Sequence, residues 1–183
     1  MTKYLGQLIE NRIIIHDILE SRRLFSEGYY GKPLGISKPK NFEFHSQLVL
    51  DLIEGYYLLI ENKLNICKPN GKPVSFKEIT NICKKQYKNF EIKYIVFESL
   101  RNKGYIVSPG IKFGCDFAVY VQGPGIDHAP YLVKVLEPFE YISGTDIVLA
   151  GRLATTVKKQ FILAIVYIED KLIKFVGFDW WKA

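Results

Sequence analysis

Apolar residues that recur every three or four positions predict several helices along the chain. The strongest periodic stretch covers residues 45–62, where charged residues such as Asp51 and Glu54 fall off the apolar stripe. Two further helices should begin where Asp17 and Ser75 each precede a glutamate by three positions, the spacing of a capping box. We therefore expect helices over residues 18–27, 45–62, 76–87 and 145–158, the last with Thr145 as its N-cap, and another within residues 84–103.

Alternation of apolar and polar residues predicts strands, mainly in the second half of the chain. Phe117 and Val119 alternate with Ala118 and Tyr120, so this strand should bury one face and turn Tyr120 toward the other. The turn Gly123-Pro-Gly125 should end it, because proline donates no backbone hydrogen bond. We expect an N-terminal hairpin within residues 5–15, strands over residues 105–108, 111–113, 116–122 and 131–136, and a C-terminal hairpin of residues 161–168 and 172–178.

The order of these elements predicts a protein of the α+β class with two domains. A chain of 183 residues suits one large or two small domains. Helices and strands are mixed as far as the turn at residues 68–73 and the helix after it, whereas strands dominate after Gly104. We therefore expect a small N-terminal α/β domain at residues 1–86 and a C-terminal domain at residues 87–183, in which helices flank a mixed sheet.

The composition is that of an ordinary globular protein, and its charge changes this picture only modestly. A net charge of +6 makes a polyanion a plausible partner. The helix within residues 84–103 carries six basic residues against two acidic ones. This charge pattern fits either a solvated helix face or a contact with a nucleic-acid backbone.

The cysteines and the apolar segments exclude several classes of protein. Cys67, Cys83 and Cys115 are widely spaced and form no C-x-x-C pair, so neither a disulfide framework nor a thiolate zinc site is indicated. The first residues carry charge too early for a secretory signal, and no stretch approaches the roughly 18 apolar residues of a membrane span. We therefore expect a cytoplasmic protein in a reducing compartment, with no membrane partner and no thiolate-bound metal.

Three polar side chains on separate elements have the chemistry needed to cut RNA without a metal ion. Tyr120 lies on an expected strand, His128 follows its glycine-rich turn, and Lys158 and Lys159 precede a later strand. Cleavage through the 2′-hydroxyl needs a proton acceptor, a proton donor for the leaving 5′-oxygen and a cation beside the phosphorane. Histidine suits proton transfer near neutral pH, and lysine suits the charge. By spacing alone, a surface histidine in a turn is the simpler interpretation of His128.

Ordered motifs in the second half resemble the C-terminal domain of the tRNA-splicing endonucleases. They are Lys103-Gly-Tyr-Ile-Val-Ser-Pro-Gly110, Phe113-Gly-Cys-Asp-Phe117 with Tyr120, His128-Ala-Pro-Tyr-Leu-Val133, and Arg152-Leu-Ala-Thr-Thr-Val-Lys-Lys159 before an apolar strand. The upstream segments that resemble the N-terminal domain of archaeal members are Gly28-Tyr-Tyr-Gly-Lys-Pro33 and Leu50-Asp-Leu-Ile-Glu-Gly-Tyr-Tyr-Leu58. The resemblance therefore covers nearly the whole chain.

The resemblance implies a metal-independent endoribonuclease that excises introns from precursor tRNA at bulge-helix-bulge junctions and leaves a 2′,3′-cyclic phosphate and a 5′-hydroxyl. By position in the family motifs, Tyr120 would be the general base, His128 the general acid and Lys159 the residue that stabilises the transition state. Lys158 is the rival for the third role and otherwise an RNA-binding residue. A phenol has a reference pKa of about 10, so either nearby cations favour the phenolate or proton transfer occurs late.

The family also uses arginine to hold an unstacked bulge base, and Arg152 matches one such position. A helix-surface ion pair explains Arg152 equally well. No arginine follows Arg152 in the chain, which departs from the family pattern. A second stacking contact would have to come from Lys171, Lys174, Trp180 or Trp181.

Members of the family work as assemblies of four subunits or pseudo-subunits, so the resemblance implies a homo- or heterotetramer. The complete set of three residues suggests a catalytic subunit, and the alternative is a noncatalytic RNA-binding or assembly subunit of the same complex. The apolar tail at residues 173–181 fits a dimerising strand, although core burial is an equally ordinary interpretation. A metal-dependent nuclease would need clustered carboxylates, for which Asp116 and Glu137 are the nearest candidates.

Overall fold

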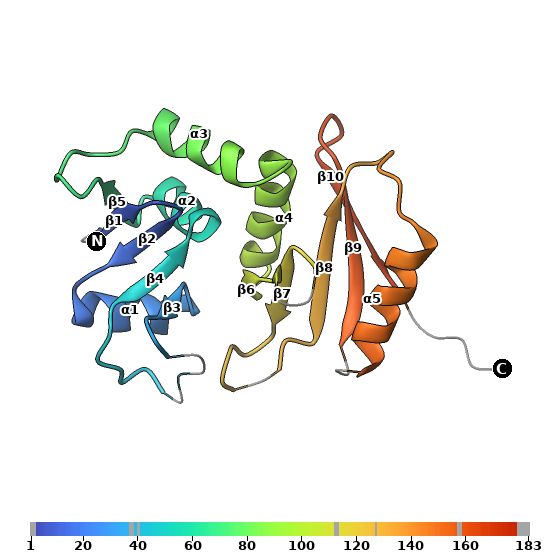
Figure 1. Ribbon diagram of the computed structural model, residues 1–183, viewed down its shortest axis with the longest axis horizontal. Helices are drawn as coiled ribbons and strands as arrows, with labels where there is room; N and C mark the ends of the chain where they lie inside the picture. Colours follow the sequence, from blue (N-terminus) through green and yellow to red (C-terminus); the bar gives the residue numbers. More distant parts are fainter. Residues whose placement is uncertain are drawn as a thin grey trace. The chain divides into compact units, whose positions relative to one another are not determined.

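The computed structural model describes residues 3–36, 39, 41–111, 114–126, 128–156 and 159–178. The chain divides into two compact units, one of Met1–Phe90 with Pro124–Ile126 and one of Glu91–Gly123 with Asp127–Ala183. Within the described residues each unit contains one five-stranded sheet with helices packed on it, which confirms the α+β class (Figure 1). The division into an assembly domain and a catalytic domain after residue 86 stays a prediction.

The first sheet has the strand order β3-β4-β2-β1-β5. Its strands are β1 (Tyr4–Ile9), β2 (Arg12–Ile15), β3 (Lys32–Pro33), β4 (Leu48–Asp51) and β5 (Leu64–Cys67). The expected N-terminal hairpin is confirmed, because β1 and β2 pair antiparallel and Glu10 turns the chain with a φ of 51°. The short strands β3 and β5 have no counterpart among the predicted elements.

The first sheet is buried on one face. Along β1, buried residues alternate with half-buried or exposed ones, and the same alternation holds along β2 and β5. Helix α2 (Leu52–Ile60) packs closely on the buried face, since a Cβ added at Gly55 would lie 2.2 Å from Cδ1 of Ile13. Helix α1 (Ile18–Gly28) is joined to the sheet through Ser21, whose hydroxyl donates to the carbonyl of Ile15 and accepts from the Leu48 amide.

The expected helix over residues 45–62 is wrong in its first part. Leu48 and Leu50 are fully buried and pair with β2 as strand β4, so tertiary pairing overrides the helical spacing. The helix starts one residue after Asp51, whose carboxylate accepts from the Ile53 amide while the Glu54 side chain accepts from the Asp51 amide. These two charges, interpreted from the sequence as off the apolar stripe, form the capping box that sets the helix start.

The other two helices of the first unit follow their predicted starts. Asp17 caps α1 by accepting from the Glu20 amide at 2.8 Å. Ser75 caps α3 (Phe76–Gln86) by accepting from the Glu78 amide at 3.2 Å. Both caps satisfy amides that the first helical turn leaves without a partner.

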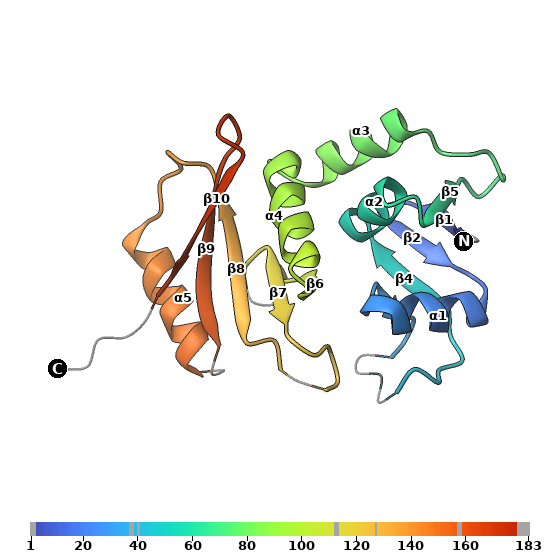
Figure 2. The same cartoon turned by 180° about the vertical axis from the view of Figure 1, so that it is seen from behind.

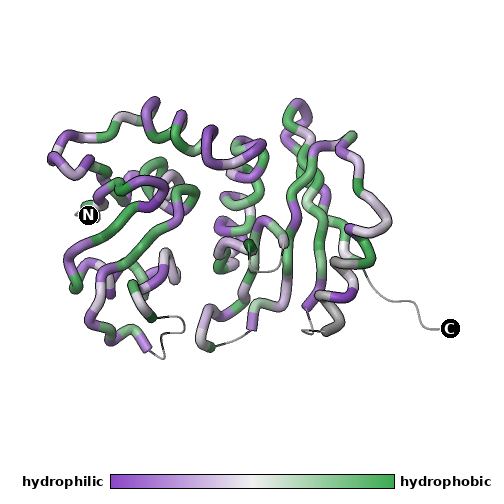
Figure 3. The backbone as a smooth tube through the Cα atoms, in the orientation of Figure 1, coloured by the Kyte–Doolittle hydropathy of each residue, from purple (hydrophilic) through white to green (hydrophobic). Residues whose placement is uncertain are grey.

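The second sheet has the strand order β10-β9-β8-β7-β6. Its strands are β6 (Ile106–Pro109), β7 (Phe117–Tyr120), β8 (Tyr131–Leu136), β9 (Gln160–Tyr167) and β10 (Leu172–Gly177). The strand β9 is hydrophobic along most of its length (Figure 3). Neighbours pair antiparallel except β8 and β9, which are parallel, so the predicted mixed sheet and C-terminal hairpin are confirmed. Helices α4 (Phe90–Asn102) and α5 (Gly144–Thr156) lie on opposite sides of it (Figure 2).

The strand β7 is buried on both faces, whereas the sequence predicted one. Phe117 packs against Phe97 of α4 with ring centroids 5.9 Å apart. On the other face, Ala118 belongs to a buried hydrophobic cluster that Tyr120 also contacts. Cover on both faces explains why Ala118 is buried although it alternates with Phe117. The predicted direction of Tyr120, away from the Phe117 face, is retained.

Three smaller expectations are also corrected. The N-cap of α5 is Ser143 and not Thr145, because the Ser143 hydroxyl accepts from the Asp146 amide while the Asp146 carboxylate accepts from the Ser143 amide. Arg101 does not belong to a solvated face, since it is only 9% exposed and stacks over Phe97. Ile111 lies in a 3₁₀ turn, and the rest of the strand expected at residues 111–113 is outside the described residues.

No helix in the part of the chain that the structure describes is long and apolar enough to cross a membrane.

Candidate active site

The register of the second sheet brings three of the predicted site residues to one end of it. Val119 of β7 pairs with Tyr131 of β8, which in turn pairs with Gln160 of β9. Tyr120 therefore ends β7 at the same level where β8 and β9 begin. His128 precedes β8 by three residues, and Lys159 precedes β9 by one. Three segments that are distant in the sequence thus bring the predicted site residues to one sheet end.

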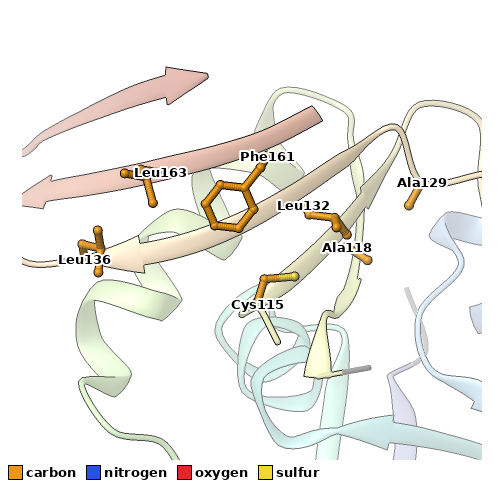
Figure 4. Packing of buried hydrophobic residues seen from close by; sticks show 7 residues of the cluster. All are labelled: Cys115, Ala118, Ala129, Leu132, Leu136, Phe161 and Leu163. Carbon is orange, nitrogen blue, oxygen red and sulfur yellow. The ribbon is translucent and has the colours of Figure 1, made fainter. Parts of the chain in front are cut away.

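Tyr120 is half-buried, and its ring is held by packing. It lies opposite Ile106 in the sheet and contacts the hydrophobic cluster on the α5 side. The buried members of that cluster are Cys115, Ala118, Ala129, Leu132, Leu136, Phe161 and Leu163 (Figure 4). An aromatic body fixed in a packed cluster restricts where the phenolic hydroxyl can lie.

His128 is exposed on the connection between β7 and β8. The turn before it needs glycine, because Gly123 and Gly125 have φ values of 131° and 100°. The residue after it, Ala129, is only 2% exposed, and the carbonyl of Pro130 accepts from the Gln160 amide at 2.8 Å. The imidazole is therefore accessible to a substrate, while the chain just beyond it is attached to β9.

Lys159 is half-buried, and its ammonium group reaches across to the His128 connection. Nζ of Lys159 donates to the carbonyl of Ala129 at 2.5 Å. The Lys159 cation also influences the buried cluster. Burial raises the pKa of the Cys115 thiol to about 11, and the nearby Lys159 cation lowers this pKa. A positive charge thus lies next to the residue that follows His128 and near the cluster that holds Tyr120.

The remaining predicted residues are not all placed. Arg152 is exposed on α5, as both of its interpretations require. Lys174 lies over the Tyr167 ring, with Nζ 5.1 Å from the centroid, and Lys171 lies in the turn between β9 and β10. Lys158, Trp180 and Trp181 lie outside the described residues, so their roles stay predictions.

The two carboxylates considered for a metal site lie away from Tyr120, His128 and Lys159. Asp116 has both oxygens engaged, one by the Lys93 ammonium at 2.7 Å and one by the Val135 amide at 2.8 Å. It precedes β7, while Glu137 follows β8 and is exposed, so neither lies at the end of the sheet that carries Tyr120. Within the described residues no group of three His, Cys, Asp or Glu side chains could hold a metal ion. Asp116 therefore has a structural role.

Two contacts within the second unit could not be found from the sequence. The Ala129 carbonyl is a backbone group, and every residue has one, so no residue type marks it as the acceptor for Lys159. The pair of Lys93 and Asp116 joins residues 23 positions apart, and only the packing of α4 on the sheet brings them together.

Comparisons with known proteins find matches for both units of the chain. A family model for the N-terminal domain of tRNA intron endonucleases matches residues 4–80, and one for the catalytic C-terminal domain matches residues 90–175. Among similar proteins are tRNA-splicing endonucleases of Sulfurisphaera tokodaii, Hyperthermus butylicus and Saccharolobus solfataricus, which are 45%, 42% and 40% identical. The alignments cover 96–97% of this chain and 97–99% of the relatives.

The match to the catalytic domain model includes all three residues at the sheet end, Tyr120, His128 and Lys159. The relatives align over nearly their whole length, so the similarity is not confined to one domain. The chain is therefore an endonuclease and belongs to the tRNA-splicing endonuclease family.

Proposed function

We propose that this chain is a catalytic subunit that cuts precursor tRNA at bulge-helix-bulge junctions without a metal ion and leaves a 2′,3′-cyclic phosphate and a 5′-hydroxyl. The observation that supports it most strongly is the hydrogen bond from Lys159 to Ala129, because it brings a cation to the backbone next to His128. The position of Tyr120 at the same sheet end supplies the third group.

Each side chain has one role in the proposed reaction. Tyr120 accepts the proton of the 2′-hydroxyl, and the 2′-oxygen forms a bond to the scissile phosphorus. The bond from phosphorus to the 5′-oxygen breaks, and His128 donates its proton to that oxygen, which leaves as a hydroxyl. Lys159 stabilises the negative charge that grows on the phosphorane oxygens between these two events. No water and no metal ion take part in this step.

The environment of each residue fits its role. General acids must reach the leaving group, and His128 is exposed. A cation acts more strongly where water is partly excluded, and Lys159 is half-buried. The same cation lies near the cluster on which Tyr120 packs, so a positive charge is close to the proposed base.

A noncatalytic subunit of the same complex is the alternative. It would have no need for a base, an acid and a cation at a single sheet end. The arrangement of Tyr120, His128 and Lys159 therefore favours the catalytic role. Arg152 and Lys158 are proposed to contact the RNA, Arg152 by holding a bulge base from the exposed surface of α5.

We also propose that the enzyme works as a homo- or heterotetramer of related subunits. The edge strand β10 is exposed along most of its length, and Leu172, Phe175 and Val176 are 43%, 37% and 42% exposed. An edge strand with exposed apolar side chains is a surface that pairing with another chain would cover. Light scattering of the purified chain tests this proposal, because a monomer that cleaves RNA at full rate would contradict it.

The test of the function is cleavage of an RNA with a bulge-helix-bulge in excess EDTA. The expected products carry 2′,3′-cyclic phosphate and 5′-hydroxyl ends, which mass spectrometry distinguishes from the alternatives. A control RNA in which both bulges are paired should stay intact. Cleavage that begins only when Mg²⁺ is added, or products with 5′-phosphate ends, would refute the proposed mechanism.

A further inference from the structure

The hydrogen bond between Lys159 and Ala129 has consequences for His128 even when no RNA is bound. Ala129 is almost fully buried, so its carbonyl oxygen has little access to water. A buried carbonyl without a partner is costly, and a bond to an ammonium group is among the stronger ways to satisfy it. No second donor to this carbonyl lies within the described residues. Lys159 therefore holds the Ala129 peptide in place.

The chain between this contact and the imidazole has little freedom. Pro130 restricts the residue before it to extended conformations, which limits the backbone of Ala129. The next residue toward β8 is fixed as well, since the Pro130 carbonyl accepts from the Gln160 amide. Lys159 and Gln160 are consecutive, so one short stretch at the start of β9 binds two consecutive carbonyls of the His128 connection. His128 is exposed but lies one residue from this double attachment.

We propose that Lys159 has a second, positioning role: through the Ala129 carbonyl it holds His128 where the imidazole can protonate the leaving oxygen. This inference rests on the proposed function, because it assumes that His128 is the general acid. One ammonium group would then serve the reaction twice, by its charge at the phosphorane and by fixing the acid before the RNA arrives. Loss of Lys159 should accordingly damage two steps, stabilisation of the phosphorane and protonation of the leaving group.

The first test uses the enzyme without RNA. Lys159→Met keeps most of the stem but removes the donor, and Lys158→Met removes a neighbouring charge as the matched control. We expect hydrogen exchange at the Gln160 amide to become about tenfold faster in Lys159→Met, because the carbonyl-binding stretch loses one of its two bonds. The Lys158→Met protein should exchange at the wild-type rate. An unchanged Gln160 amide in Lys159→Met would overturn the positioning role.

The second test uses a substrate that needs no general acid. Replacing the leaving 5′-oxygen by sulfur gives a thiolate leaving group, which departs without protonation. In single-turnover cleavage with chemistry rate-limiting, His128→Ala should recover most of its lost rate on the sulfur substrate. Lys159→Met should recover in part, with a loss about tenfold smaller than on the oxygen substrate. Tyr120→Phe is the control and should lose the same factor on both, because its role precedes departure of the leaving group.

The outcomes separate the two claims. If His128→Ala recovers but Lys159→Met loses the same factor on both substrates, Lys159 acts only through its charge, and the positioning role is refuted while the proposed function stands. If His128→Ala does not recover, His128 is not the general acid, and the proposed function fails together with the inference that rests on it. Partial recovery of Lys159→Met with faster Gln160 exchange supports the second role.

Discussion

The two sheets of this protein bury their residues differently, and the difference explains where the candidate site lies. The first sheet has one buried face, so its strands alternate between buried and accessible residues. The central strands of the second sheet are covered on both sides, and β7 has three consecutive buried residues. A strand packed on both faces is held by close contacts on each side. The second sheet therefore offers a rigid frame on which a base, an acid and a cation can be held.

The largest contrast should appear in the cleavage rate of two histidine variants. His128→Ala removes the proposed general acid and should lower the single-turnover rate about 10² to 10⁴ fold, with RNA affinity nearly unchanged. His16→Ala is the matched control, since His16 is also exposed but lies in the first unit, where it contacts Gln7 and Gln47. Equal losses of rate and affinity in His128→Ala would make His128 a binding residue.

The two adjacent lysines should separate rate from binding. Lys159→Ala should lower the single-turnover rate at saturating RNA by about 10² fold, because it removes a charge contact made mainly in the transition state. Lys158→Ala should instead weaken binding and flatten its salt dependence, or have no effect. Should Lys158→Ala abolish cleavage while Lys159→Ala cleaves normally, the third catalytic residue is Lys158.

The difference in burial between the two sheets can be tested by replacing one leucine of each sheet with alanine. Leu132 of β8 is 0% exposed and belongs to the cluster against which Tyr120 packs, whereas Leu5 of β1 is 57% exposed. Leu132→Ala should lower the free energy of unfolding by about 2 to 5 kcal/mol, and Leu5→Ala by less than about 0.5 kcal/mol. Denaturant unfolding measures both. A large loss in Leu5→Ala would show that the accessible face of the first sheet is covered in solution.

The smallest expected effect concerns the start of α5. Ser143→Ala removes the hydroxyl that accepts from the Asp146 amide and should cost about 1 kcal/mol of stability. Thr145→Ala is the control and should cost much less. The reverse order would restore Thr145 as the cap.

The pH dependence of stability gives a second test of the Ser143 cap, because Asp146 belongs to it. Hydrogen bonds from Ser143 hold the pKa of the Asp146 carboxyl below its usual value of 3.8. A group with a depressed pKa stabilises the folded state above that usual value, and its contribution is lost as the pH falls through the folded pKa. The stability of Ser143→Ala should therefore fall less steeply than that of the wild type as the pH is lowered below about 4.

The sequence predicted the elements best where local signals decide them. The capping pairs at Asp17 and Ser75 and the N-terminal hairpin were right, because each depends on neighbouring residues. The stretch around Leu50 was predicted as helix, because its strand forms only by pairing with β2. Burial of Ala118 was missed for a similar reason, since no local pattern reveals that a second layer covers the other face.

Motifs in the sequence predicted the residues of the candidate site, but they did not predict its geometry. The motifs give the three residue types in order, but the strand register that brings Tyr120, His128 and Lys159 to one end depends on pairing between distant segments. The bond from Lys159 to a backbone carbonyl has no sequence signal at all. The motifs therefore predict which residues form the candidate site, whereas the contact between Lys159 and the His128 connection could be found only from the fold.

The central claim is that Tyr120 and His128 serve one cleavage reaction at one sheet end. The most direct test compares single-turnover cleavage by Tyr120→Phe, His128→Ala and the double variant. Residues that act as a unit lose activity together, so the double variant should be slower than the worse single variant by less than about tenfold. Losses that multiply in full, as for independent sites, would contradict the account.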